Sequence, residues 1–307
     1  MLLTVLGIAL CHPAGAATDA GRSPQALGES YFVSHDTEGF STNALAVEYL
    51  PEFKHGNDLT AVKVTFRDYS QGNWRRESQQ VSLIRRSIDP ATANGWQMDA
   101  GLSAQGQHET LTLDGSYHRP LAAKAGLDLF INRDWVETRA ALDRGIDFTF
   151  FGGSIDQGIG EHWTVVGVAG LQYFSDSNTR EHYRAKLVFQ PMLDSGLTLQ
   201  LRYRTFHSSS LNVGAAYFNP ANYDETLFAV GWRKRIEGWV LRATGGAGVQ
   251  HVNSDPGSNT RLVELQLDSP YKGKQFIRVR GGYNQSASFG GPNYAYTYLQ
   301  GEWIFRL

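Results

Sequence analysis

The most regular stretch of the chain, residues 196–205, alternates between apolar and polar side chains without an error. A period of two residues predicts a β-strand with one apolar and one polar face, because successive side chains of a strand point in opposite directions. Two arginines on the polar face indicate that this face contacts water. The apolar positions are Leu197, Leu199, Leu201 and Tyr203, and the polar positions are Thr198, Gln200, Arg202 and Arg204.

A second alternating stretch, residues 224–236, follows after a long polar segment. It places Phe228, Val230 and Trp232 on one face and Arg233 and Arg235 on the other. Only two residues, 237 and 238, then separate it from the next apolar segment. A long loop at one end of a strand pair and a two-residue turn at the other end are typical of outer-membrane β-barrels.

The same alternation runs along most of the chain and predicts an all-β fold: a transmembrane, antiparallel, up-and-down β-barrel of about sixteen strands. With a periplasmic amino terminus, the turns at 194–196, 237–238 and 270–273 lie on the periplasmic side. The longer segments 208–223 and 253–259 then lie outside the cell. The strands are predicted at residues 30–36, 42–50, 59–68, 74–88, 96–105, 110–118, 126–136, 146–157, 162–176, 181–190, 196–205, 224–236, 239–252, 261–267, 276–287 and 294–307.

Composition supports a barrel over other membrane architectures. The mean hydropathy is −0.34 and 19% of the residues are charged, which excludes a polytopic helical membrane protein. Beyond the first residues no apolar run approaches the roughly 18 residues that a spanning helix needs. A barrel tolerates so polar a chain because only every second residue meets lipid. The alternative is a secreted, soluble β-sandwich or solenoid.

Three segments follow from this interpretation. Residues 1–17 have an apolar run followed by small residues and are predicted to be a secretory signal peptide. Residues 18–29 are predicted to be a short periplasmic lead-in, and residues 30–307 the outer-membrane barrel. The single cysteine, Cys11, lies within the predicted signal, so we expect a mature chain without a disulfide.

Charged residues recur on the water-facing side of the predicted strands. An arginine or lysine on the lipid face would cost about 2–4 kcal/mol at mid-membrane, so these residues are expected to face the lumen. Bases outnumber acids among them although the net charge of the chain is −2, a value that argues against a nucleic-acid partner. The bases are Lys63, Arg67, Arg184, Lys186, Arg202, Arg204, Arg233, Arg235, Arg278 and Arg280, and the acids are Glu48, Asp114, Asp128, Glu264 and Asp268.

Two interpretations of these charges remain open. They form either a ladder of opposite charges that stiffens the wall, or a polar track along which guanidinium groups bind the carboxylate or hydroxyl groups of a sugar chain. The second interpretation predicts a preference for anions. The lumen track is then predicted to comprise Arg184, Lys186, Arg202, Arg204, Arg233, Arg235, Arg278, Arg280, Glu264 and Asp128, with Tyr294, Tyr296 and Tyr298 as candidates for stacking on sugar rings.

No motif of an enzyme is recognisable. The sequence lacks the nucleotide-binding, hydrolase and metalloprotease fingerprints, and its nine histidines have no metal-ligand spacing. The pairs His35-Asp36 and His207-Ser208 end two strands, but adjacent residues of a strand point to opposite faces. We therefore predict no catalytic residues, no metal and no cofactor. A barrel enzyme acting on lipid or surface glycan is the alternative.

Residues 217–223, Tyr-Phe-Asn-Pro-Ala-Asn-Tyr, precede an arginine-bearing strand and a glycine-rich segment at 245–248. This pattern resembles the carboxy-terminal barrels of exopolysaccharide secretion porins, the cellulose and poly-N-acetylglucosamine exporters. In that family a Tyr-aromatic-Ser-Pro-x-x-Tyr segment lies late in a sixteen-stranded barrel. The matching residues here are Tyr217, Phe218, Pro220 and Tyr223, and Asn219 replaces the commoner serine.

The resemblance implies export of a polysaccharide, such as a biofilm exopolysaccharide, across the bacterial outer membrane. The partners implied are outer-membrane lipid, the glycan chain in transit and the barrel assembly machinery, which is expected to read the closing strand. The family also carries a periplasmic tetratricopeptide scaffold ahead of its barrel, and this sequence has no such repeat. Either a separate protein supplies that scaffold, or the barrel has another function, such as that of a general or anion-selective porin.

Overall fold

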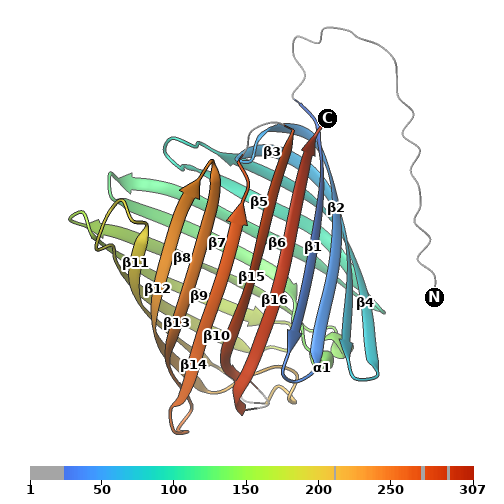
Figure 1. The fold of residues 1–307 in the computed structure, drawn as a ribbon. Helices are drawn as coiled ribbons and strands as arrows, with labels where there is room; N and C mark the ends of the chain where they lie inside the picture. Colours follow the sequence, from blue (N-terminus) through green and yellow to red (C-terminus); the bar gives the residue numbers. More distant parts are fainter. Residues whose placement is uncertain (1–23, 211, 271–273, 289–290) are drawn as a thin grey trace, which may run out of the picture.

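The computed structural model describes residues 24–210, 212–270, 274–288 and 291–307. Within these residues the chain forms sixteen strands and one short helix (Figure 1). Each strand pairs antiparallel with the next, and the first pairs with the last, which closes the barrel. The predicted up-and-down barrel of sixteen strands is confirmed. The predicted signal peptide, residues 1–17, lies outside the described residues.

The predicted strands match the observed ones closely. The fourth and the thirteenth have the predicted bounds, and most of the others are a few residues longer than predicted. The elements are β1 (Ala26–Asp36), β2 (Phe40–His55), β3 (Asp58–Gln71), β4 (Trp74–Ile88), β5 (Gly95–Gln105), β6 (His108–Ala122), β7 (Ala125–Trp135), α1 (Arg139–Arg144), β8 (Asp147–Ile159), β9 (Trp163–Phe174), β10 (Thr179–Phe189), β11 (Leu197–Ser208), β12 (Asn222–Ile236), β13 (Trp239–Val252), β14 (Ser258–Asp268), β15 (Gln275–Ser288) and β16 (Gly291–Arg306).

The first strand begins earlier than predicted. Residues 26–29, expected in the periplasmic lead-in, pair with β2 on one side and β16 on the other. Ala26 is fully buried at the start of this strand. A small residue and a glycine at 26 and 28 hid the alternation, because neither marks its face by a large apolar or charged side chain.

The two faces of the wall have opposite chemistry. Large apolar side chains such as Leu83, Leu102 and Leu111 are more than 60% exposed on the outer face. Polar side chains such as Gln80 and Ser103 are buried on the inner face. A closed sheet with an apolar exterior satisfies every strand hydrogen bond inside the membrane and is the arrangement of outer-membrane barrels. Among the described residues, no helix is long and apolar enough to cross a membrane.

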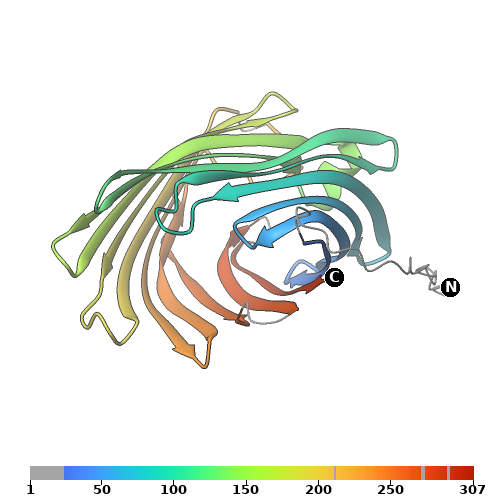
Figure 2. The same cartoon turned by 90° about the horizontal axis from the view of Figure 1, so that it is seen from above.

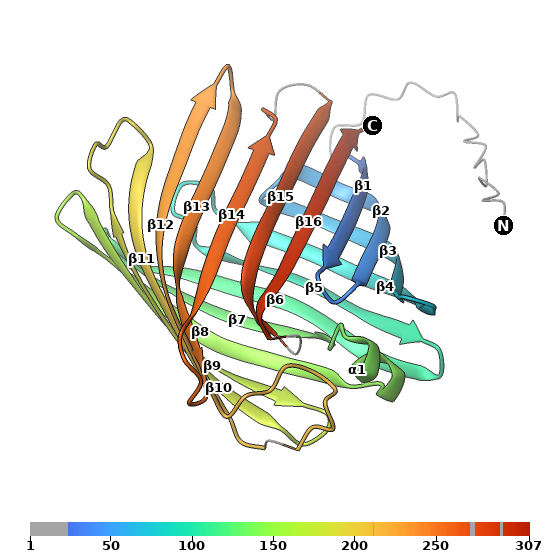
Figure 3. The ribbon, with the colours of Figure 1, turned by 60° about the horizontal axis from the view of Figure 1, so that its bottom comes forward.

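The predicted turns 194–196 and 237–238 lie at one end of the barrel, and the predicted loops 208–223, apart from residue 211, and 253–259 lie at the other, where two-residue turns also occur at 72–73 and 106–107. Ala26 pairs with Arg306, so both ends of the described chain lie at one end of the barrel (Figure 1). The tight turn at Glu237 and Gly238 lies at the same end, and both residues have the positive φ that a two-residue hairpin turn requires. We assign this end to the periplasm. The helix α1 and the long loop 209–221 lie at the other, extracellular end (Figure 3). Residues 271–273 of one predicted turn lie outside the described residues.

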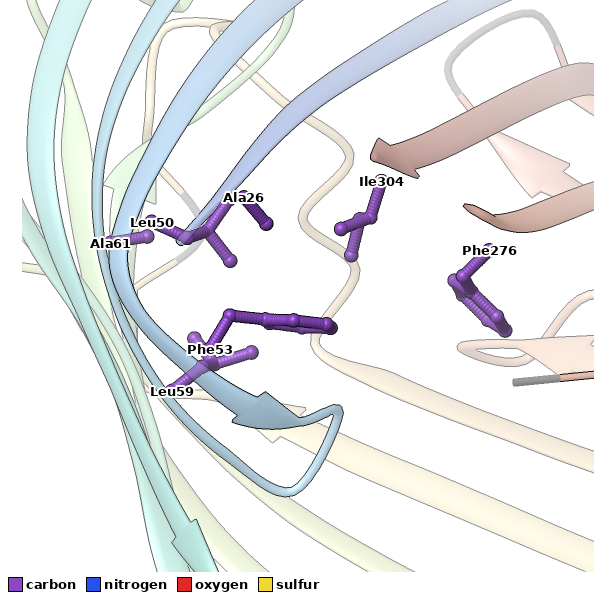
Figure 4. Close-up of a cluster of buried hydrophobic side chains, with 7 residues drawn as sticks. All are labelled: Ala26, Leu50, Phe53, Leu59, Ala61, Phe276 and Ile304. Carbon is purple, nitrogen blue, oxygen red and sulfur yellow. The ribbon is translucent and has the colours of Figure 1, made fainter. Parts of the chain in front are cut away.

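An apolar cluster lies on the inner side of the wall near the periplasmic end, among β1–β3, β15 and β16 (Figure 4). A register shift in β2 between Tyr49 and Glu52 accompanies the burial of Phe53, whose side chain is only 1% exposed. Figure 2 shows the strands closing into a ring when the barrel is seen from above. The cluster comprises Ala26, Leu50, Phe53, Leu59, Ala61, Phe276 and Ile304.

Candidate solute path through the lumen

Strand register places the predicted track residues on the inner face. Arg184 lies directly opposite Arg204, and Lys186 directly opposite Arg202, across the β10–β11 pair. The outward positions between them are taken by apolar residues such as Tyr183 and Leu187, which are exposed to the lipid side. Four bases are therefore adjacent on one section of the lumen wall.

Three of these bases, Arg184, Lys186 and Arg202, form what we term the basic cluster. Within the described part of the chain, none of the three has an acidic partner at ion-pair distance. The guanidinium of Arg202 donates to Gln200 Oε1, at 3.0 Å from Nε and 2.8 Å from Nη2. The neighbouring lumen positions on β9, opposite Arg184 and Lys186, are valines. Like charges directly opposite each other destabilise a sheet. Because none of the three bases has an acidic partner among the described residues, the positive charge of this cluster is available to an anion in the lumen.

Arg204 has a different environment from the basic cluster. Its Nη2 atom lies 2.9 Å from Glu225 Oε2 and 3.0 Å from the hydroxyl oxygen of Tyr223. The Tyr223 hydroxyl also lies 2.9 Å from Gln250 Oε1, and Thr260 donates to Glu225. This network joins β11, β12, β13 and β14, so Arg204 braces the wall. Glu225 was not predicted as a lumen residue, although it lies an even number of residues from Arg233 and Arg235 and therefore on the same face of β12.

The two predicted arginines of β15 also differ. Arg278 lies 2.7 Å from Asp268 and 3.3 Å from Glu302, and Arg242 makes a second ion pair with Asp268. Arg280 has no ion pair or side-chain hydrogen bond with any described residue. It lines a lumen cavity of about 580 Å³ that lies against β1–β7, β15 and β16. Arg278 therefore braces the wall, whereas Arg280 presents its charge to the cavity.

Arg233 and Arg235 lie on the inner face of β12 close to its periplasmic end, and both are exposed. Arg233 is directly opposite Arg242, and Arg235 is directly opposite Val240. Neither makes an ion pair with a described residue. These two arginines add positive charge at the periplasmic entrance of the lumen, on the same sector as the basic cluster.

The acidic lumen residues are spread around the barrel: Asp114 and Asp128 lie on β6 and β7, and Glu264 lies on β14. Asp128 lies 2.7 Å from His118 Nδ1 and accepts a 3.2 Å hydrogen bond from Ser154. Glu264 makes no ion pair with a described residue. Neither Asp128 nor Glu264 therefore neutralises an arginine among the described residues, although other opposite charges do pair across the wall. The alternation along a single strand could not show which acids pair with the arginines. Their partners, Glu225, Asp268 and Glu302, come from neighbouring strands.

The remaining predicted lumen residues also face inward. Lys63 pairs with Asp99, and Arg67 lies 3.9 Å from Asp134 and donates to Gln80. Glu48 and Asp114 line the cavity. The three tyrosines of β16 form part of the inner wall: Tyr296 stacks on Tyr298 at 5.9 Å, and the Tyr294 hydroxyl donates to Asp36 at 3.2 Å.

Two segments form a mouth cap at the extracellular end: residues 136–146, which contain α1, and the loop 209–221, apart from residue 211. Leu142 of α1 is fully buried against Tyr69 and Trp135 on one side of the lumen. Asp143 accepts a hydrogen bond from Trp74 at 3.0 Å and another from Arg76. The helix begins after Thr138, which caps it, and ends at Gly145, whose φ is 65°.

The loop 209–221, apart from residue 211, packs against this helix and against the rim of β9 and β10. Tyr217 stacks on Phe174 at 4.4 Å, in a cluster that also contains Ala141 of α1. Arg144 donates to the carbonyl oxygens of residues 213 and 214, at 3.2 and 2.9 Å. Burial raises the pKa of the Tyr217 phenol far above its usual range, so this hydroxyl stays protonated and donates to Asp176. The sequence did not predict the cap, because α1 has only six residues and shows no amphipathic period.

The predicted family motif lies in this cap. Phe218 contacts Phe206 and Tyr223 edge-on, at 6.5 and 6.2 Å between ring centroids. Pro220 is buried, and the side chain of Asn219 accepts hydrogen bonds from Asn178 and Arg180. The motif thus folds the loop onto the upper rim of β10–β12.

The two residue pairs considered for catalysis are separated by the wall. His35 is exposed on the outside and contacts Ser41, whereas Asp36 is buried and accepts hydrogen bonds from the backbone of residues 38 and 40. His207 likewise contacts Asn222, and Ser208 is buried. In the described part of the chain, no three histidine, cysteine or acidic side chains gather in a way that would hold a metal.

Comparison with solved structures agrees with the geometry. The chain is a sixteen-stranded outer-membrane β-barrel of bacterial type. It superposes on a bacterial polysaccharide outer membrane secretin with a TM-score of 0.68 over 93% of this chain and 99% of that one, at 12% sequence identity. This likeness confirms the fold expected from the resemblance to exopolysaccharide secretion barrels.

Two further solved barrels give lower TM-scores. CdiB from Acinetobacter baumannii gives a TM-score of 0.47 at 10% identity, covering 92% of this chain and 60% of that one. An anion-selective porin from Comamonas acidovorans gives 0.39 at 10% identity, covering 92% and 98%. No protein-family model and no curated protein matches the sequence.

Proposed function

We propose that this outer-membrane barrel is a channel through which an anionic polysaccharide leaves the cell. The observation that carries the proposal is the basic cluster, Arg184, Lys186 and Arg202, which faces the lumen with no acid at ion-pair distance among the residues that the structure describes. Basic groups on a pore wall favour anions. Arg280, Arg233 and Arg235 extend the positive charge toward the periplasmic entrance.

Two further observations favour a polysaccharide over a small anion. The barrel is similar in fold to a solved polysaccharide secretin over nearly its whole length. Most of the segment that resembles the export porins, residues 217–221, forms part of the mouth cap, where a chain leaving the lumen would meet it, and its last two residues begin β12.

The proposal is tested by single-channel recordings of the purified barrel in planar bilayers. Acidic and neutral oligosaccharides of equal length are added on the periplasmic side. We expect the acidic oligomers to interrupt the ion current at lower concentration than the neutral ones. The double substitution Lys186→Gln with Arg202→Gln should remove most of that difference.

The matched control is Arg75→Gln, because Arg75 lies on the outward face of β4. This variant should behave like the unmutated protein. Blocking by neutral and acidic oligomers at the same concentration would contradict the proposal. A channel that conducts chloride but is not blocked by any oligosaccharide would identify an anion-selective porin instead.

A further inference from the structure

A row of aromatic rings crosses the lumen wall beside the basic cluster. We term this row the aromatic ladder: Phe130 of β7, Phe150 of β8, His182 of β10 and Phe206 of β11. Successive ring centroids are 5.1, 5.0 and 5.4 Å apart. All four side chains are partly exposed on the inner face. Tyr223 continues the row onto β12 at 4.9 Å from Phe206.

Glycines let two of these rings lie along the wall. Phe130 is directly opposite Gly152, and a Cβ atom at Gly152 would lie 2.8 Å from Phe130 Cζ. A Cβ atom at Gly170 would lie 2.7 Å from Phe150 Cε2. Rings over glycines also stiffen a sheet. That role alone does not require four neighbouring rings to remain in contact with lumen water, which is unfavourable for apolar surface.

The ladder is aligned with the basic cluster. On β10 the inner-face residues are His182, Arg184 and Lys186, at the spacing of about 7 Å between alternate residues of a strand. Toward the mouth, the Arg180 guanidinium lies 4.4 Å from the ring centroid of Phe206 and donates to the carbonyl oxygen of Phe218 at 2.8 Å. Arg184 therefore presents its charge on one side of the ladder, whereas Arg180 covers one end of it, over Phe206, and is held by the loop through Phe218 and Asn219.

We propose that the aromatic ladder is a binding subsite for pyranose rings that carry a carboxylate, so that the exported polymer is a uronate-containing glycan. The inference rests on the proposed function and names its substrate class. The C–H face of a pyranose ring stacks on aromatic rings, and its carboxylate reaches the guanidinium of Arg184, which makes no ion pair with a described residue. A guanidinium fork matches a carboxylate.

The test uses the same single-channel recordings with three probes of similar length: oligogalacturonate, a neutral cello-oligosaccharide and oligoglutamate, an anion without sugar rings. The variants are Phe150→Leu and Phe206→Leu, singly and together, which keep an apolar side chain but remove the ring. The control is Phe151→Leu, because Phe151 is the neighbour of Phe150 on the outward face and is exposed there.

We expect the double variant to raise the oligogalacturonate concentration for half-maximal block about tenfold, with each single variant raising it less. Block by oligoglutamate should not change, and Phe151→Leu should have no effect. Heat-dependent mobility on gels shows that each variant is folded, and the two single variants give independent readouts.

Unchanged block by oligogalacturonate in both single variants would overturn the subsite. Equal loss of block for oligoglutamate would also overturn it, because the rings would then act only on wall structure. Either result leaves the proposed function intact if Lys186→Gln with Arg202→Gln still weakens block. If that basic variant has no effect on any acidic probe, the proposed function itself fails.

Discussion

At the scale of single residues, two kinds of lumen arginine are present, although they are identical in the sequence pattern. Arg204 and Arg278 are held by acids of neighbouring strands. Arg184, Arg202 and Arg280 make no ion pair with a described residue. The alternation identified the inner face for each arginine, because a charged side chain on the lipid-facing side is unfavourable in free energy. The ion-pair partners of each arginine depend on the register between neighbouring strands. The alternation along one strand carries no information about that register.

This difference predicts opposite effects on stability. Glu225→Gln should destabilise the barrel by about 1–3 kcal/mol, because Glu225 is buried and accepts hydrogen bonds from Arg204, Tyr223 and Thr260. The measurement is the urea dependence of unfolding from lipid vesicles. A free energy of unfolding equal to that of the unmutated protein would show that this network does not brace the wall.

Lys186→Gln should leave stability unchanged or raise it by up to about 1 kcal/mol, because it removes the repulsion from the directly opposed Arg202. The same unfolding measurement applies. Clear destabilisation would mean that Lys186 has a favourable partner and that the basic cluster is not a source of free positive charge.

At the scale of elements, the strands were predictable and the mouth cap was not. Each spanning strand shows its period of two because lipid selects every second side chain. The helix α1 is held by long-range contacts, such as Leu142 against Tyr69 and Trp135, and these leave no local period. The aromatic ladder was missed for the same reason, since its rings come from four strands.

The cap should open when its anchor is weakened. Leu142→Ala removes a fully buried side chain and should cost the docked cap about 2–5 kcal/mol. We expect larger and noisier single-channel conductance. Leu121, which is exposed on β6, provides the control substitution Leu121→Ala. An unchanged conductance in the Leu142 variant would show that the cap does not limit the path.

The cap should also respond to acid. Partial burial alone would raise the pKa of Asp143, but hydrogen bonds from Arg76 and Trp74 outweigh it and hold that pKa below its usual value of 3.8. A lowered carboxyl pKa stabilises docking above the undocked pKa, and this contribution is lost as pH falls below about 4. Conductance should therefore be steady from neutral pH to about 5 and rise below 4.

The substitution Asp143→Asn provides the matched test of this acid response. It should raise conductance at neutral pH and remove most of the rise below pH 4. If the Asn variant keeps the full acid response, another group controls the cap.

At the scale of the whole molecule, the sequence was sufficient for the class of fold. Strand number, direction and the asymmetry of turns and loops all follow from the alternation and its interruptions, such as the turn at 237–238. The distribution of charge between sectors of the lumen did not follow, because it depends on which strands lie beside each other. Lumen acids such as Asp114, Glu225 and Asp268 are spread around the barrel, whereas bases without an ion pair to a described residue adjoin one another on β10–β12, so the net charge of −2 conceals a positively charged sector.

The most direct test of the account is the reversal potential of the unmutated barrel in a planar bilayer with a potassium chloride gradient. The unneutralised basic cluster predicts that chloride is more permeable than potassium, and that Lys186→Gln with Arg202→Gln reduces this preference while the barrel stays folded. Equal permeability, or a preference for potassium, in the unmutated protein would contradict the account.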